Sequence, residues 1–470
     1  MKNKKSPSRF GIRDKLGYLF GDFGNDFTFR LSSTFLLKFY TDVIGVDAAI
    51  VGIVMMVARF IDAFTDVTMG RICDNSKITA NGKFKPWILR MSGPVAIASF
   101  LMYQSSFANA HIAIKIVWLS VTYILWSSVF YTSVNIPYGS MASAISDNPD
   151  DRQSLSTFRT MGGLFANIFV SFLVPLIAYD KIIKNGEEIV VLNGGRFTVI
   201  AGVFSIFAVI CYLLCYRLVT ERVHREDAEA RQNNSVGKML LNAFRNRALI
   251  SIIVASVLML IAQLTMQQMA SYVFPNYYRN ASAQAISTLM MGIAMSGTAA
   301  FVKPICKKYG KAEISIIASI FSAVVFGLLL IIRPANVWIY VLLQGLCWLG
   351  NGVFSMINWA LITDVIDYSE IKNGVREDGG VYALYSFARK LGQALAVGLT
   401  GALLTLIGYN EATAFDRTVL EGVFNISTKI PGIAFLALAL VLWFWYPLHK
   451  KQVDKNVAIL KKKHGSPEEK

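Results

Sequence analysis

Charged side chains lie inside long apolar stretches of this sequence. Arg59, Asp62 and Asp66 follow one another at intervals of three and four residues, which places them on one face of a helix. If the stretch crosses a membrane, each such charge costs about 2.5–3.5 kcal/mol on insertion scales. The two carboxylates, with the Thr65 hydroxyl between them, offer oxygen ligands to a small cation, or they share a proton. The simpler alternative is an internal ion pair between Arg59 and Asp62.

A second group of charges combines carboxylates with guanidinium groups. Asp22, Asp26 and Arg30 share one helical face of the first apolar stretch, and Arg159 lies in the fifth. Carboxylates and guanidinium groups hydrogen-bond sugar hydroxyls, and aromatic rings pack on sugar rings. We therefore expect a clamp of Asp26 and Arg159; the alternatives are helix-to-helix salt bridges and an internal pair between Asp22 and Arg30. Further candidates are Tyr131, Asn135 and Lys390 for the sugar, and Thr132 and Asn135 for the cation.

The composition indicates that the apolar stretches cross a membrane. The chain has 470 residues, 54% of them apolar and 16% charged, with a mean hydropathy of +0.48. Soluble proteins carry about 25% charged residues, and no polar linker divides this chain into soluble-sized blocks. The net charge is +16, but the basic residues lie mostly in short gaps between apolar stretches. This pattern is typical of membrane proteins and not of nucleic-acid binders, so we expect a lipid bilayer and no nucleic acid as partner.

Twelve stretches are long enough to cross a bilayer, which takes roughly 20 residues. They cover approximately residues 16–41, 47–70, 87–107, 113–138, 156–179, 197–217, 248–275, 285–305, 312–333, 337–362, 380–408 and 428–447. We predict an all-α polytopic membrane protein with twelve transmembrane helices in two six-helix halves. Residues 1–217 form the first half, 218–247 a central cytoplasmic loop, 248–449 the second half and 450–470 a cytoplasmic tail. Lys and Arg gather in alternate gaps, which predicts that both termini are cytoplasmic.

Several function classes lack their sequence signals. Each Gly-Lys pair lacks the Ser or Thr that follows in a nucleotide-binding loop, which argues against a primary pump. No histidine lies inside a predicted span to serve an intramembrane enzyme, and the mixed charges do not resemble the like-charged ring of a channel. The halves also echo each other, with Trp126 and Asn135 in the fourth span and Trp348 and Asn358 in the tenth. Repeat-built halves are typical of secondary transporters. We expect no enzyme and no cofactor.

Short motifs also match a known family over nearly the whole chain. They are GDFGND (21–26), FYTD (39–42), RFIDAFTD (59–66), GKFKPW (82–87), NIPYGS (135–140), DVIDY (364–368) and KLG (390–392). In this combination the sequence resembles the glycoside–pentoside–hexuronide:cation symporters, a branch of the major facilitator superfamily.

The resemblance implies a secondary active transporter that moves a sugar with sodium or protons by alternating access, in a bacterial inner membrane. It implies a cation site at Asp62 and Asp66 with Thr132 as an auxiliary ligand, and no metal beyond a sodium ion. For the sugar it implies Asp26 and Arg159, with Lys390 nearby and Trp359 lining the pocket. The chief alternative is a carrier of the same fold for a lipid or a peptide.

Three positions depart from the melibiose permease of this family. Asn25, Asn135 and Gly139 stand where that protein has lysine, aspartate and tryptophan. The NIPYGS string is more similar to the glucuronide and pentoside carriers, which favours a uronide or pentoside and leaves both sodium and proton coupling open. A cavity with several cations, from Arg159, Arg389 and Lys390, and one fewer carboxylate also suits an anionic sugar.

Two basic and acidic segments are candidates for gating. Arg71 with Lys83 and Lys85 lies in the second gap, and the stretch from Asp364 to Arg376 follows the tenth span. We expect these segments to close the cytoplasmic side. The alternative is that their charges only set the topology.

Overall fold

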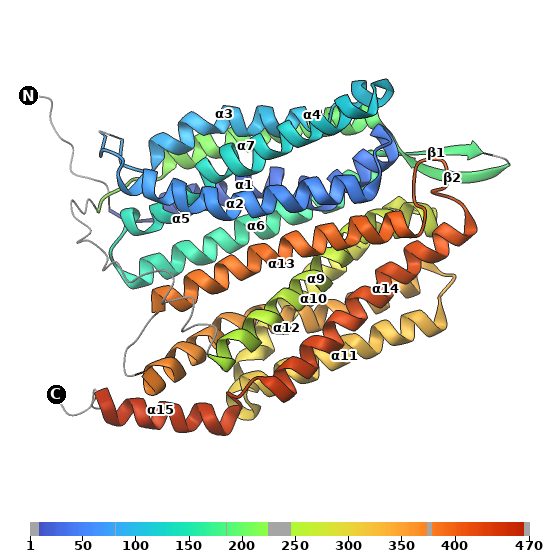
Figure 1. Ribbon diagram of the computed structural model, residues 1–470. Coiled ribbons are helices and arrows are strands. Elements are labelled where there is room, and N and C mark those ends of the chain that lie inside the picture. Colours follow the sequence, from blue (N-terminus) through green and yellow to red (C-terminus); the bar gives the residue numbers. More distant parts are fainter. Residues whose placement is uncertain (1–8, 80, 185, 224–245, 374–377, 465–470) are drawn as a thin grey trace, which may run out of the picture. The chain divides into compact units, whose positions relative to one another are not determined.

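The computed structural model describes residues 9–79, 81–184, 186–223, 246–373 and 378–464, which are almost entirely helical (Figure 1). The chain begins with α1 (Ile12–Phe39), η1 (Tyr40–Ile44), α2 (Ala48–Asp74), α3 (Lys85–Leu101) and η2 (Ser105–Asn109). Then α4 (Ile112–Ile124) continues through the π-helical segment η3 (Leu125–Tyr131) into α5 (Thr132–Ile145). After α6 (Pro149–Ile177), the strands β1 (Tyr179–Lys184) and β2 (Glu187–Leu192) form an antiparallel hairpin that leads to α7 (Gly194–Leu218). The sequence patterns do not predict this hairpin.

The rest of the described chain is helical as well. It consists of α9 (Arg247–Tyr272), η4 (Val273–Tyr277), α10 (Ala281–Tyr309), α11 (Lys311–Ile332), α12 (Val337–Asn373), α13 (Asp378–Leu406), α14 (Arg417–Leu440), η5 (Val441–Trp445) and α15 (Lys450–His464). Asparagine and aspartate side chains cap the first turns of several helices by accepting backbone N–H groups. These caps are Asp47, Asn148, Asn193 and Asn246.

The predicted helical fold is confirmed. Each of the twelve predicted spans falls on helix within the described residues. Eight helical runs are long and apolar enough to cross a membrane, or nine if a bent pair within α10 counts as one span. The other three predicted spans are α1, α3 and α13. Charged side chains interrupt α1 and α13, and α3 has 17 residues.

Large apolar side chains are exposed on the outer helices. Phe64 and Val67 on α2 and Ile206 on α7 are 61–69% exposed. A soluble protein rarely exposes so many large apolar side chains. Contact with lipid accounts for them.

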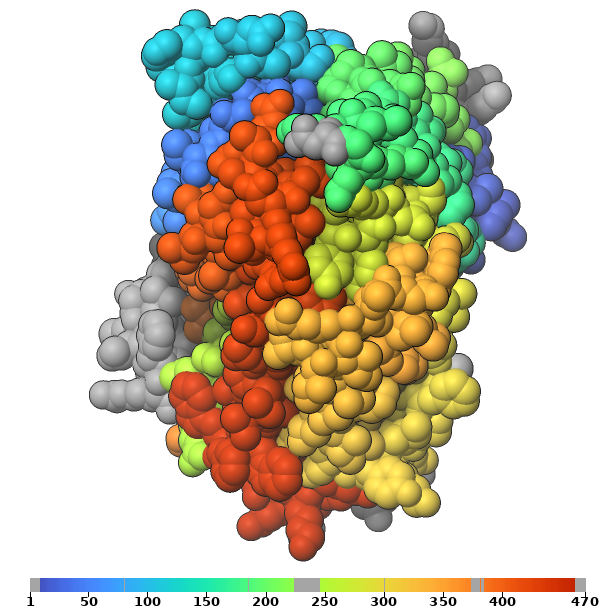
Figure 2. All heavy atoms as spheres, turned by 90° about the vertical axis from the view of Figure 1, so that its right-hand side faces the viewer, coloured from blue at the N-terminus to red at the C-terminus, as the bar shows by residue number. Residues whose placement is uncertain are grey.

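The chain divides into two compact units. The first contains Met1–Glu229, Phe274–Ala285 and Gly401–Val419, and the second contains Ala230–Val273, Ile286–Thr400 and Leu420–Lys470. Two short stretches from the second half of the sequence therefore belong to the first unit. Figure 2 looks onto the end that carries them, where the α13–α14 connection (orange) lies beside the β1–β2 hairpin (green). The predicted boundaries at 217, 248 and 450 stay a prediction.

Helix α1 is central to the first unit, because it packs along both α6 and α7 (Figure 1). Its apolar residues Leu31, Phe35 and Leu36 are fully buried. Gly162 on α6 permits close approach, since a Cβ there would lie 2.4 Å from the Leu19 carbonyl oxygen on α1. The charges on α1 are therefore held inside a packed unit. The second unit has its own core, which includes Ile252, Phe354, Leu361 and Leu438.

We expect Gly162→Ala to destabilise the protein, because the added methyl group meets backbone that must shift. Overpacking of this kind costs about 1–3 kcal/mol. Gly93→Ala on α3 is the matched control, since nothing lies within 4 Å of a Cβ at that position. Thermal unfolding in detergent measures both variants. A Gly162→Ala variant as stable as the control contradicts the close α1–α6 packing.

Candidate binding and coupling site

The charges of α1 form two ion pairs in the first unit. Arg159 Nε on α6 donates to Asp22 Oδ1 at 3.0 Å, and Arg30 Nε donates to Asp26 Oδ2 at 3.1 Å. The Asp22–Arg30 pair that the sequence left open therefore does not form. Arg159 binds Asp22 and not Asp26, and the clamp of Asp26 and Arg159 on a sugar stays a prediction. Arg30 reaches Asp26 across one helical turn, which is the closer of its two possible partners on α1.

This first cluster is partly accessible. The Arg159 side chain is 41% exposed and its guanidinium lies over the Tyr138 ring at 5.2 Å. A Cβ at Gly163 would lie 2.9 Å from Asp22 Oδ2 and 3.1 Å from Asp26 Oδ2. The two carboxylates thus rest against the same glycine of α6. Neighbouring carboxylates beside an accessible guanidinium can bind several hydroxyl groups of one ligand.

A second cluster joins α2 to the η3–α5 segment. Ser128 Oγ donates to Asp62 Oδ1 at 2.5 Å, and Thr132 Oγ1 donates to Asp66 Oδ1 at 2.8 Å. Ser128 and Thr132 are four residues apart, as are the two aspartates. The two hydrogen bonds therefore lie one helical turn apart along the packed helices. Asp62 is 5% exposed and also binds Arg59 at 3.3 Å, so the internal ion pair considered as the alternative is present. Two carboxylates and two hydroxyls are oxygen ligands of the kind that hard cations prefer.

One aromatic ring contacts both clusters. The guanidinium of Arg30 lies 5.9 Å and that of Arg59 lies 5.1 Å from the centre of the Phe29 ring. Tyr131 stacks on Phe29 with ring centres 5.9 Å apart. If either guanidinium group moves, its contact with the Phe29 ring changes. The predicted sugar candidate Tyr131 lies at this junction.

Asn135 belongs to a third, uncharged group. Its Oδ1 accepts from Asn25 Nδ2 at 3.5 Å, and Asn25 Oδ1 accepts from the Tyr212 hydroxyl at 2.9 Å. These contacts join α1, α5 and α7. The Thr65 hydroxyl donates to the backbone oxygen of Asp62 at 3.3 Å, and its role as a cation ligand stays a prediction.

The second unit holds a comparable polar group. Ser256 Oγ on α9 lies within hydrogen-bond distance of Asn358 Oδ1 (3.1 Å) and of the Tyr385 hydroxyl (3.2 Å), and the Asn358 amide donates to Tyr385. Trp359 follows Asn358, is 41% exposed and meets the Tyr385 ring edge-on. The echo between Asn135 and Asn358 thus corresponds to an asparagine hydrogen bond in each unit, partly buried at Asn135 and buried at Asn358. Lys390 lies on the same helix as Tyr385, α13.

Comparison with known proteins identifies the family. The family described as "MFS/sugar transport protein" matches residues 17–450. The chain belongs to this family. It is therefore a multi-pass membrane transporter and not an enzyme, and the predicted resemblance to the glycoside–pentoside–hexuronide:cation symporters is confirmed.

Bacterial relatives of this MFS sugar transporter match almost end to end. It is 30% identical to the uncharacterized symporter YjmB of Bacillus subtilis, over 98% of this chain and 97% of the relative. It is 30% identical to a putative sulfoquinovose importer of Salmonella typhimurium, over 94% and 91%. It is also 30% identical to a glucuronide carrier protein homolog of Escherichia coli, over 95% and 94%.

Solved transporter structures share the fold. The xylose transporter XylE from E. coli, in an inward open conformation, gives a TM-score of 0.61 at 12% identity, over 95% of this chain and 98% of that chain. The nucleoside transporter NupG gives 0.58 at 15% identity, over 91% and 98%. At such low identity the likeness shows the fold alone. It confirms the predicted fold class.

Two of the predicted gating residues hold the start of α3 against the segment that follows α7. The Glu221 carboxylate accepts the backbone N–H groups of Lys83, Phe84 and Lys85 at 2.6, 3.0 and 2.8 Å. The Lys85 ammonium donates to the Val219 carbonyl oxygen at 2.7 Å. Glu221 is not among the residues predicted from the sequence, although a carboxylate just after a long span is a signal for such an anchor.

The other predicted gating residues are Asp364, Arg71 and Arg376. Asp364 binds Lys311 at 2.5 Å in the second unit. Arg71 is exposed at the end of α2. Arg376 lies outside the described residues. The gating role of all five residues stays a prediction.

Glu221→Ala leaves three backbone donors without their acceptor, so we expect a loss of stability. A donor left unsatisfied on burial costs about 1–3 kcal/mol, and the α3 N-terminus also loses a favourable negative charge. Glu221→Gln keeps one acceptor oxygen and should lie between wild type and alanine in thermal unfolding. Equal unfolding temperatures for wild type and Glu221→Ala rule out this anchor.

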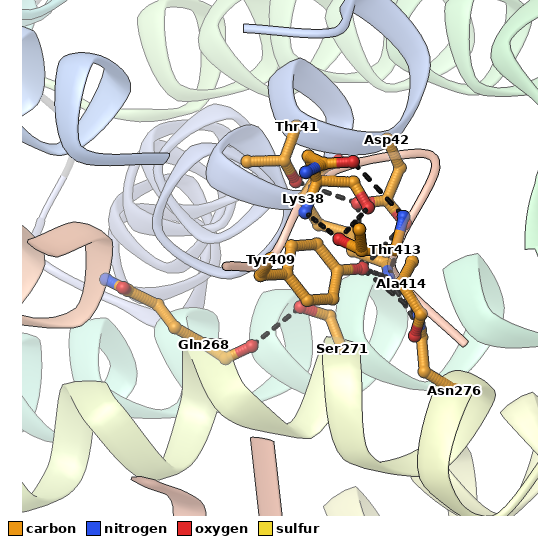
Figure 3. A network of polar contacts seen from close by, with 10 residues as sticks. Lys38, Thr41, Asp42, Gln268, Ser271, Asn276, Tyr409, Thr413 and Ala414 are labelled. Atoms are coloured by element: carbon orange, nitrogen blue, oxygen red, sulfur yellow. Dashed lines mark hydrogen bonds and ion pairs between the residues drawn. The ribbon is translucent and has the colours of Figure 1, made fainter. Parts of the chain in front are cut away.

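A buried lysine network at the far end of α1 has no counterpart in the sequence analysis. Lys38 is 1% exposed, and its Nζ lies 2.5 Å from Asp42 Oδ2, 2.6 Å from Asn276 Oδ1 and 2.7 Å from Tyr409 Oη (Figure 3). The Tyr409 hydroxyl in turn donates to Asp42 at 3.0 Å. Asn276 and Tyr409 come from the two stretches of the second sequence half that belong to the first unit. The signal in the sequence is Lys38 four residues before the aspartate of FYTD.

Proposed function

We propose that this transporter carries an anionic sugar, such as a hexuronide, together with a cation by secondary active symport. One arrangement carries the proposal, namely two clusters of different chemistry that contact the same ring, Phe29. The Asp22–Arg159 and Asp26–Arg30 pairs supply charged hydrogen-bonding groups for sugar hydroxyls. The pairs of Asp62 with Ser128 and Asp66 with Thr132 supply oxygen ligands for the ion.

The anionic character of the sugar has two supports. Two of the relatives at 30% identity are named for a glucuronide and for sulfoquinovose, which carry a carboxylate and a sulfonate. The polar group around Asn25 and Asn135 is uncharged, so this part of the unit adds no carboxylate to repel an anion. Sugar residues of the first unit in this proposal are Asp22, Asp26, Arg159, Tyr131 and Asn135. The assignment of Trp359 and Lys390 to the sugar stays a prediction from the sequence.

Coupling requires that sugar and ion favour the same state of the carrier, because a ligand shifts an equilibrium only by its differential affinity. The Phe29 ring can connect the ion cluster to the sugar cluster, because it contacts an arginine of each. If ion binding between Asp62 and Asp66 moves Arg59, the ring that Arg59 shares with Arg30 moves too. The Asp26 carboxylate is then repositioned for the sugar.

Alternating access requires the two ends of the carrier to open in turn. The Lys38 network lies at one end of α1, and the Glu221 anchor lies near the other. We assign the closing of the extracellular end to the first and of the cytoplasmic end to the second, together with Lys83 and Lys85. This orientation follows the basic gaps of the sequence and leaves both termini cytoplasmic.

Counterflow in proteoliposomes tests the proposal. Liposomes preloaded with 4-nitrophenyl β-D-glucuronide should take up the labelled compound faster than paired liposomes take up the neutral 4-nitrophenyl β-D-glucoside. An imposed sodium or proton gradient should then concentrate the glucuronide, and the effective gradient identifies the ion. Faster movement of the glucoside overturns the anionic substrate. Accumulation under neither gradient overturns symport.

A further inference from the structure

One intramembrane arginine differs from the others in its partners. Arg30, Arg59 and Arg159 each bind a carboxylate, at 3.1, 3.3 and 3.0 Å. Arg389, in the middle of α13, binds none among the residues that the structure describes. Its polar contact is the Tyr385 hydroxyl at 3.5 Å, and its guanidinium lies over the rings of Trp359 and Tyr385 at 5.6 and 5.9 Å. Within the described part of the chain, no acid therefore compensates the positive charge of Arg389.

The surroundings of Arg389 indicate a hydrated face. A guanidinium stays charged at any physiological pH, and lipid does not solvate it. The indole beneath it is 41% exposed, so the stack lies at a surface of the second unit and not in its core. Stacking on a ring occupies the face of the guanidinium and leaves most of its edge N–H groups available. We infer that this surface lines the water-filled path of the carrier.

The stack is also held in place. Tyr385 lies one helical turn before Arg389, and Trp359 directly follows Asn358. Asn358 and Tyr385 are buried and hydrogen-bond each other and Ser256, so three helices fix both supports of the guanidinium. A receptor fixed before binding loses little entropy when the ligand arrives.

We propose that Arg389, stacked on Trp359, binds the carboxylate or sulfonate of the sugar and so determines selectivity for anionic over neutral substrates. The inference rests on the proposed function and identifies the residue that recognises the negative charge of the sugar. A guanidinium edge matches two oxygens of a carboxylate or sulfonate at once. Arg159 is less suited, because Asp22 already binds its guanidinium.

Selectivity in two variants tests the inference. Transport of 4-nitrophenyl β-D-glucuronide and of the matched glucoside is measured by competition in proteoliposomes for wild type, Arg389→Gln and Arg389→Lys. We expect Arg389→Gln to weaken glucuronide binding about 10- to 100-fold, as for the loss of a charged hydrogen bond, and to leave glucoside binding unchanged. Arg389→Lys keeps the charge without the paired N–H groups and should fall between. Lys308→Gln, which removes an exposed charge from the same unit, is the control.

The outcomes separate this inference from the proposed function. If wild type prefers the glucuronide and Arg389→Gln keeps that preference, Arg389 does not recognise the negative charge of the sugar. The proposal that the substrate is an anionic sugar is then unaffected. An equal loss for both sugars also overturns the inference, because it indicates a structural role. If wild type prefers the glucoside, the anionic substrate itself is wrong. Arg389→Lys provides the same comparison if Arg389→Gln does not fold.

Discussion

Asp66→Asn is expected to abolish gradient-driven accumulation of the sugar while sugar exchange continues. Asparagine keeps the size of the side chain and an oxygen that accepts the Thr132 hydroxyl bond, now at 2.8 Å from Asp66. It lacks the negative charge that attracts a cation or takes up a proton. Without ion binding, the ion gradient cannot drive sugar uptake through the carrier. The internal sugar concentration should therefore fall to the external value.

The measurement compares accumulation under an ion gradient with counterflow in the absence of one. Asp74→Asn is the control, because Asp74 is an exposed carboxylate at the end of the same helix. Asp62→Asn should also lose accumulation, but it leaves the buried Arg59 guanidinium without its acid and so perturbs the fold. An Asp66→Asn carrier that concentrates sugar like wild type places the ion site elsewhere.

Lys38→Met is expected to cause the largest loss of stability. The ammonium is buried against Asp42, Asn276 and Tyr409, and its removal leaves the Asp42 carboxylate without its counter-ion (Figure 3). Breaking a buried ion pair by removing one partner costs about 3–5 kcal/mol. The stretches around η4 and the α13–α14 connection also lose their attachment to α1.

Thermal unfolding in detergent measures this loss, with two comparisons. Lys181→Met removes one member of an exposed hairpin ion pair, which is worth about 0–1 kcal/mol, and should change little. The double variant with Lys38→Met and Asp42→Asn should recover much of the stability, because no unpaired charge remains. If Lys38→Met unfolds at the same temperature as Lys181→Met, the buried pair does not hold this end together.

The helices could be predicted from the sequence because the signal is local. About 20 apolar residues in a row are sufficient to cross a bilayer, whatever the rest of the chain does. The placement of Asp22, Asp26 and Arg30 on one face also follows from helical spacing alone. The hairpin between α6 and α7 does not follow from the search for membrane spans, because each of its strands has only six residues and lies between two spans.

Partners between helices could not be predicted in the same way. Ser128 is an ordinary small residue in the sequence, and only the packing of η3 against α2 shows that it binds Asp62. The pairing of Arg159 with Asp22 depends on Gly162 and Gly163, which allow α6 to approach α1 closely. The Lys38 network depends on residues more than 200 positions away.

Local sequence patterns are therefore sufficient to predict a helical membrane transporter of the MFS sugar family and to show which helices carry its costly charges. Which acid neutralises which base follows from the three-dimensional packing, as does the finding that Arg389 has no acid among the described residues. The physical reason is that the span of a helix and the cost of a buried charge are properties of the local chain. A hydrogen bond of about 3 Å between helices depends on their rotation and separation, which packing of the whole unit sets.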